Sequence, residues 1–129
     1  MDAAQALDEL RELSSQVEVA VVLQPDGAVL AATTDDAEHA SSVARAALDL
    51  VTAASDLHGS DRDVSRVDVE LAEGAIFVLR EAGRTIAATT GPDPTTGLVV
   101  YDLRTCLRRI DEDARPKRRR APRLPKESE

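Results

Sequence analysis

The residues with catalytic or metal-binding chemistry are few, and they are scattered along the chain. His39 and His58 are the only histidines, and no cysteine lies near either of them, so they do not form a local metal-binding pair. The serines stand in no nucleophile-elbow pattern, and no glycine-rich loop of the kind that holds phosphates is present. Asp35 and Asp36 are explained by a helix cap more simply than by an acid and base pair. The sequence therefore predicts no enzymatic activity, no metal and no cofactor.

The single cysteine, Cys106, indicates a compartment rather than a reaction. One cysteine excludes a disulfide within the chain, and it stands among apolar residues at helical spacing, as core cysteines do. The first residues, MDAAQALDEL, are acidic and amphipathic, unlike a signal peptide, and no apolar run approaches the ~18 residues of a membrane span. We therefore expect a cytoplasmic protein without a membrane span.

The stretch from Asp35 to His58 predicts a long helix around which the chain is organised. Asp35 or Asp36 can cap its start, and Gly59 follows its end. Its apolar residues cover roughly 200° of the circumference, where one buried contact needs about 100°. Such a helix packs on its own sheet and on a second partner, unless it is half sunk in a larger core or is an alanine-rich surface helix. The two stripes are Ala37, Ala40, Ala44, Ala47, Leu48 and Val51, and beside them Val43, Ala46, Leu50, Ala53, Ala54 and Leu57.

Short apolar segments joined by tight turns predict a mostly antiparallel sheet with helices on both faces. The segment from Val64 to Leu71 alternates cleanly, and its polar face predicts an edge strand or a face open to water or a partner. We expect strands over residues 17–24, 28–33, 64–71, 75–80 and 84–90, and further helices over 3–15 and 98–113.

Charge divides the chain into two parts. The net charge is −8, but residues 115–129 hold seven basic and two acidic side chains, so that this end carries +5 and residues 1–114 carry −13. Three prolines and clustered like charge cannot bury a core. We therefore expect one domain over residues 1–113 and a disordered basic tail over 114–129. The residues of this tail best placed for electrostatic contacts are Lys117, Arg118, Arg119, Arg120 and Arg123.

Taken together, several stretches of the chain resemble a bacterial member of the roadblock family, the dynein-light-chain-type regulators of Ras-like GTPases. They are VEVAVVLQPDGAVLAATT, the alanine-rich helix, VDVELAEGAIFVLREAGRTIAATT and GLVVYDLRTCLRRI, which together span roughly residues 3–112. The succession of an apolar strand, an Asp-Gly turn, a strand ending in small residues and an alanine-rich helix is fairly specific. No single residue in it is diagnostic.

The resemblance implies an α/β (α+β) fold, a profilin-like roadblock sandwich with a five-stranded antiparallel sheet and the order α-β-β-α-β-β-β-α. It also implies a homodimer in which the long helices pack on each other and the third strands meet at their edges. The corresponding interface candidates are Val43, Ala46, Ala47, Leu50, Ala54, Leu57, Arg66, Asp68 and Glu70.

Three functions remain open at this stage. The resemblance implies a non-enzymatic dimeric regulatory or scaffold protein that binds a small Ras-like GTPase. The alternative from charge alone is an electrostatic adaptor, whose basic tails bind nucleic acid or an acidic protein. A small-molecule sensor is the third, because profilin-like sensor domains share a similar outline and the fold alone does not decide function.

Overall fold

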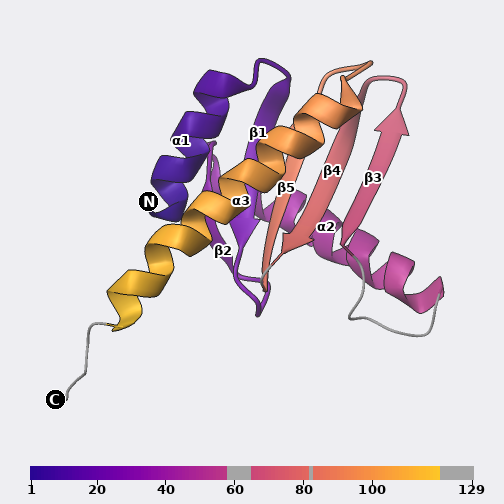
Figure 1. The fold of residues 1–129 in the computed structure, drawn as a ribbon. Helices are drawn as coiled ribbons and strands as arrows, with labels where there is room; N and C mark the ends of the chain where they lie inside the picture. The colour runs from indigo at the N-terminus through magenta and orange to yellow at the C-terminus, as the bar shows by residue number, and fades with distance from the viewer. Residues whose placement is uncertain (58–64, 82, 120–129) are drawn as a thin grey trace, which may run out of the picture.

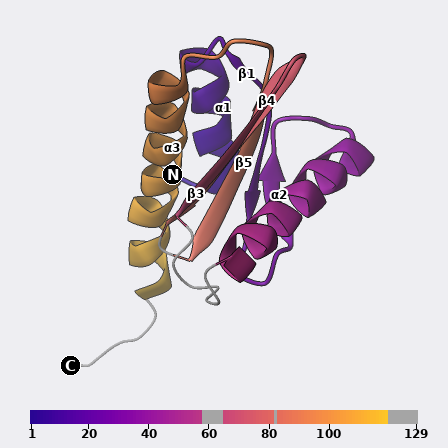
Figure 2. The ribbon, with the colours of Figure 1, turned by 90° about the vertical axis from the view of Figure 1, so that its right-hand side faces the viewer.

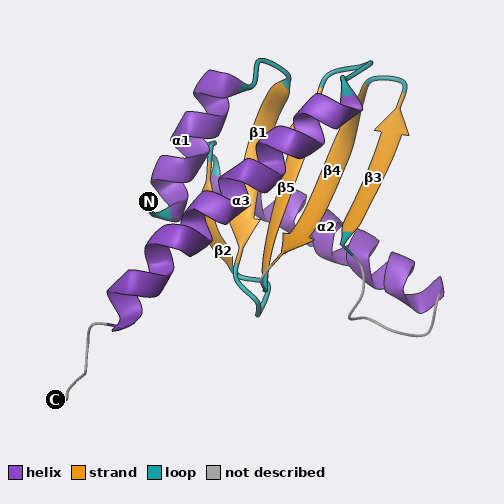
Figure 3. Cartoon of the chain, viewed as in Figure 1, coloured by secondary structure: helices purple, strands orange, loops and turns teal. Residues whose placement is uncertain are grey.

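The order of helices and strands agrees with the sequence prediction over the residues that the computed structural model describes, 1–57, 65–81 and 83–119 (Figure 3). The expected loop at 58–63, its Gly59 cap and the strand start at Val64 lie outside these residues. The elements are α1 (Ala3–Leu13), β1 (Val17–Leu23), β2 (Val29–Ala32), α2 (Ala37–Leu57), β3 (Arg66–Leu71), β4 (Gly74–Glu81), β5 (Arg84–Thr90) and α3 (Thr96–Arg119).

The five strands form one antiparallel sheet in the order β2-β1-β5-β4-β3. Strands β1, β5 and β4 are central and largely buried on both faces, which is the pattern of strands covered on both sides. Strand β3 stands at one edge, as its alternation predicted, and pairs only with β4 among the described strands.

Helices cover both faces of the sheet, two on one side and one on the other. Figures 1 and 2 show α1 and α3 against one face and α2 crossing the opposite face. Because successive strand residues point to opposite faces, Phe77 and Ala88 join the α1/α3 core while their neighbours Val78 and Ala87 join the α2 core. The sheet thus separates two apolar clusters that share no side chain.

The two helices on the first face are fixed by a cap and by ion pairs. Asp2 caps α1 by accepting from the Gln5 amide at 2.9 Å, and the Gln5 side chain accepts from the Asp2 amide at 3.2 Å, which completes a capping box. Glu9 of α1 pairs with Arg109 of α3. Glu81, at the end of β4, binds both Arg104 (3.4 Å) and Arg108 (3.0 Å) of α3.

Two glycines are required by the backbone around them. Gly27 has a φ of 91° in the Pro25–Gly27 turn between β1 and β2, where its amide donates to the Gln24 carbonyl at 2.8 Å. Gly74 begins β4 so close to β5 that a Cβ there would stand 2.3 Å from the carbonyl oxygen of Thr90. A side chain at position 74 would therefore push these neighbouring strands apart.

Helix α3 extends to Arg119, beyond the end near Asp113 that the sequence predicted. The prolines and clustered like charge of this end predicted disorder, and a proline inside a helix removes an amide donor and disfavours the preceding turn. The residues around Pro116 are good helix formers, and the helix continues through them. The segment 114–119 is therefore helical, and residues 120–129 lie outside the described chain.

Candidate functional site

Helix α2 begins at a carboxylate cap and is anchored by a row of small side chains. The Asp36 carboxylate accepts from the amides of Glu38 (3.0 Å) and His39 (3.1 Å), so Asp36 rather than Asp35 provides the predicted cap. The face toward the sheet is mostly alanine and valine, which brings the helix axis close to the strands. The buried residues of this face are Ala40, Val43, Ala44, Ala47, Val51 and Ser55.

Two of the predicted interface residues belong to this inner face. Val43 is buried and Ala47 is 0% exposed, and both pack in the cluster with Val21, Val78 and Ala87 of the sheet. Their side chains are buried between α2 and the sheet, so they do not lie on the surface of a single subunit.

The rest of the second stripe forms an uncovered apolar flank of α2. Ala46 and Ala53 are exposed, Leu57 is 82% exposed, and Leu50 and Ala54 are half-buried. These five residues are called the outer flank below. On a helix whose opposite face already contacts the sheet, such a flank is available to a partner.

Beside α2, the sheet leaves a row of side chains only partly covered. Val19 of β1, Thr89 of β5, Ile76 of β4 and Val69 of β3 are cross-strand neighbours, and all four are half-buried. They are called the open row below. The other side of α2 faces the row that contains Thr85 and Arg80, so the outer flank faces the open row. Figure 2 shows α2 crossing this face of the sheet.

The edge strand β3, which pairs only with β4 among the described strands, carries a line of charges. Arg66, Asp68 and Glu70 are exposed, and the Arg66 Nε atom lies 2.9 Å from Asp68 Oδ1. Asp68 stands opposite Phe77 of the α1/α3 core, so these charges lie on the face of the sheet away from α2. The predicted interface residues thus fall on the outer flank, on the free edge or in the core.

The groups considered for catalysis are not brought together. Cys106 is buried in α3, where burial, reinforced by the nearby Glu9 carboxylate, raises the pKa of its thiol to about 12. His39 lies in the first turn of α2, and His58 lies outside the described residues. Within the described part of the chain, no three His, Cys, Asp or Glu side chains gather as a metal site, and no helix is long and apolar enough to cross a membrane.

The basic residues proposed as a tail divide between α3 and the undescribed end. Lys117, Arg118 and Arg119 belong to the last turns of α3, whereas Arg120 and Arg123 lie outside the described residues. Figure 1 shows the C-terminal turns of α3 extending past the lower end of the sheet.

Comparison with known proteins gives the same fold. No curated protein sequence matches the chain closely enough to count as a relative. The structure is similar to a Roadblock/LC7 domain from Streptomyces avermitilis, with a TM-score of 0.76, 22% identity, and coverage of 88% of this chain and 98% of that one. The gliding protein MglB from Thermus thermophilus gives a TM-score of 0.63 and 19% identity, over 86% of this chain and 89% of its own.

A further similar structure is an MglB in a tetrameric arrangement, with a TM-score of 0.61, 20% identity, and coverage of 85% of this chain and 90% of that one. Identities this low show a shared fold. The sequence profile of the Roadblock/LC7 domain matches residues 3–90, from the start of α1 to the end of β5. The chain therefore belongs to the Roadblock/LC7 domain family.

Proposed function

We propose that this protein is a homodimeric, non-enzymatic regulator or scaffold that binds a small Ras-like GTPase in the cytoplasm. The observation that carries the proposal is the outer flank of α2, which lies uncovered beside the open row of the sheet and on the same subunit as the free edge of β3. In a monomer the outer flank would be open to solvent and the β3 edge would lack a second strand, so both features favour an interface.

A second copy of the chain can cover the outer flank and pair with the β3 edge at the same time. In a two-fold symmetric contact the same surface is used by both subunits, so outer flank meets outer flank and β3 meets β3. Ala46 and Ala53 are small enough for two helices to approach closely, while Leu50 and Leu57 supply apolar area. Pairing of the two β3 edges would satisfy their free backbone groups.

The charges of β3 are compatible with such a pairing. In an antiparallel two-fold register centred on Val67, Arg66 stands opposite Asp68 of the partner subunit. In the register centred on Asp68, Arg66 stands opposite Glu70 of the partner subunit. Opposite charges directly across an antiparallel pair are favourable, and like charges are unfavourable. The register centred on Val67 is therefore favoured, because the register centred on Asp68 would set the two Asp68 carboxylates opposite each other.

The GTPase partner is supported by the family rather than by a catalytic group. The roadblock resemblance implies regulation of Ras-like GTPases, and the similar solved structures include MglB proteins. Symmetric pairing of the chains would place two copies of each surface on one particle, as a scaffold requires.

A pull-down with purified Ras-like GTPases tests the proposed partner. Each GTPase is loaded with GDP or with a non-hydrolysable GTP analogue and offered to the immobilised protein. Retention that depends on the nucleotide supports the regulator. Retention of no GTPase in either state, with a correctly folded dimer on the beads, contradicts it.

An electrostatic adaptor is the second candidate, and the separation of charge favours it. Residues 115–129 carry +5 beside a body of −13, and a dimer would present two such segments, which raises avidity. If the segments contact DNA, each neutralised phosphate contributes about −0.9 to the slope of log affinity against log salt. Deleting residues 115–129 should then abolish DNA retention at 50 mM salt. Equal retention of the full-length and truncated chains, or none, would end this proposal.

A further inference from the structure

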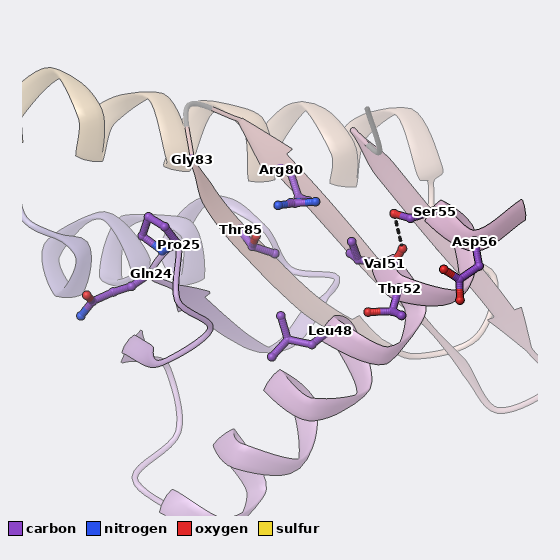
Figure 4. A pocket seen from close by; sticks show the side chains of 10 residues that line it. All are labelled: Gln24, Pro25, Leu48, Val51, Thr52, Ser55, Asp56, Arg80, Gly83 and Thr85. Carbon is purple, nitrogen blue, oxygen red and sulfur yellow. Dashed lines mark hydrogen bonds between the residues drawn. The ribbon is translucent and has the colours of Figure 1, made fainter. Parts of the chain in front are cut away.

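An open cavity of about 300 Å³ lies beside α2 on the side away from the outer flank, and most of the residues that line it are exposed (Figure 4). Its walls come from the C-terminal half of α2, from the turn after β1 and from the β4–β5 hairpin. This volume is at the lower end of the range of ligand pockets, about 300–1,000 Å³. Its lining combines aliphatic groups with polar side chains: Gln24, Pro25, Leu48, Val51, Thr52, Ser55, Asp56, Arg80, Gly83 and Thr85.

Arg80 is the unusual residue of this cavity. It stands on β4, an interior strand of the sheet, and on the face toward α2, where the preceding residues of that face, Ile76 and Val78, are apolar. Its neighbour across the sheet is the buried Thr85. Among the described residues no carboxylate forms an ion pair with Arg80, although Arg66, Arg104, Arg108 and Arg109 each have one. Arg80 is exposed, and its guanidinium lines the cavity without a carboxylate partner among the described residues.

Asp56 supplies the opposite charge to the same cavity. It lies in the last turn of α2, which contains no basic residue, and a carboxylate near a helix C-terminus is disfavoured by the helix dipole. In Figure 4, Asp56 lies at the end of the cavity away from Gln24 and Pro25, and Arg80 lies across from Leu48. Arg80 and Asp56 are both exposed, line the same cavity and form no ion pair with each other.

We propose that this cavity binds a small aliphatic amino acid, with its carboxylate on Arg80 and its ammonium group on Asp56. The guanidinium fork suits a carboxylate, and charge-assisted hydrogen bonds are about twice as strong as neutral ones. Thr52 and Thr85 add hydroxyl groups, whereas Leu48, Val51 and Pro25 offer an apolar wall for a short hydrocarbon chain. The site lies on the other side of α2 from the outer flank, so binding leaves the proposed dimer contact unchanged.

The test is titration of the full-length protein with four matched compounds, followed by amide NMR shifts. L-valine and δ-aminovalerate are isomers that carry both charges at different separations. Valerate lacks the ammonium group and amylamine lacks the carboxylate. One of the two isomers should bind saturably at millimolar concentrations, with shifts at Thr52, Arg80 and Thr85. Each singly charged compound should bind about tenfold or more weakly, because it lacks one charged hydrogen bond.

Substitutions of Arg80 and Asp56 show whether both charged side chains take part in binding. Arg80→Gln and Asp56→Asn should each weaken binding of the favoured isomer about tenfold or more. The matched controls Arg45→Gln and Asp49→Asn, on exposed parts of α2 outside the cavity, should not. Circular dichroism melting checks that all four variants fold. No saturable shift with either isomer overturns the proposal. Equal binding of valerate, or loss only with Arg80→Gln, overturns the amino acid assignment.

Discussion

Ala46 and Ala47 are neighbours in α2, yet Ala47 is 0% exposed against the sheet while Ala46 is open to solvent on the outer flank. The Ala47 methyl group therefore contacts the sheet, whereas the Ala46 methyl group is free to contact a partner. Ala47 belongs to the core of one subunit, and Ala46 belongs to the surface proposed to meet a second subunit. The same substitution at the two positions separates folding from assembly.

We expect Ala46→Glu to dissociate the dimer and leave the subunit folded, because the carboxylate is solvated in the monomer and buried without a partner in the dimer. Such burial costs several kcal/mol. Light scattering on a size-exclusion column should report the 13.8 kDa chain mass for this variant and about twice that mass for the wild type. Ser41→Glu adds the same charge to an exposed site outside the outer flank, so it should remain dimeric. A monomeric wild type would contradict the proposal.

We expect Ala47→Glu to unfold the subunit itself. Its carboxylate would enter the apolar cluster that contains Val21, Val78 and Ala87. A penalty of several kcal/mol is a large part of the ~5–15 kcal/mol that stabilises a domain. Thermal melting followed by circular dichroism should show a large loss of folded protein. A midpoint equal to that of Ala46→Glu would show that the α2 layer adapts to the charge.

We expect Arg66→Glu to weaken the dimer about tenfold. In two of the possible β3 registers the new carboxylate would stand opposite a carboxylate of the partner subunit, and the change occurs twice in a symmetric dimer. Sedimentation at several protein concentrations measures the dissociation constant. Arg45→Glu makes the same change of charge on exposed α2 surface and serves as the control. An unchanged constant would place β3 outside the interface.

We expect Gly74→Ala to destabilise the fold by about 1–3 kcal/mol, the usual cost of forcing extra volume into a packed site. The added Cβ would meet the Thr90 carbonyl oxygen at 2.3 Å, and this contact is backbone, so it cannot be relieved by a side-chain rotation. Gly97→Ala is the control, because apart from its own helical turn no atom lies within 4 Å of its Cβ position in the first turn of α3. Urea unfolding should show that Gly97→Ala is neutral or slightly stabilising.

We expect the Cys106 thiol to lower stability as pH rises through the alkaline range. In the folded protein its pKa is about 12, whereas an unfolded thiol ionises near 8.5. Unfolding therefore releases a proton between these values, so the contribution is fully present below pH ~8.5 and is lost as pH rises toward 12. Urea unfolding at neutral and alkaline pH should show a steeper loss for the wild type than for Cys106→Ala. Parallel curves would show that the buried thiol does not titrate differently in the two states.

The elements were predictable because each carries a local period, but their contacts depend on long-range pairing. Alternation in Val64 to Leu71 predicted the edge strand, which the structure has, whereas the second contact expected from the width of the α2 apolar face stays a prediction. A helical wheel gives the angles between residues but does not show which side of the helix contacts the sheet. Val43 is therefore expected at the partner from the sequence, whereas the structure packs it against the sheet. That Arg80 and Asp56 line the same cavity had no signal in the sequence, because strand order and register create it.

The unequal helical layers on the two faces of the sheet predict that the two faces open at different free energies. Two helices and most of the large buried side chains, including Phe77, Leu103 and Leu107, hold the α1/α3 face, whereas α2 alone covers the other face with a smaller cluster. Segments with fewer buried apolar contacts open locally at lower free energy than the global transition. The amides of α2 should therefore exchange with deuterated solvent by a partial opening in which α1, α3 and the central strands stay protected. A second subunit against the outer flank would raise the free energy of that opening and so slow the exchange of the α2 amides.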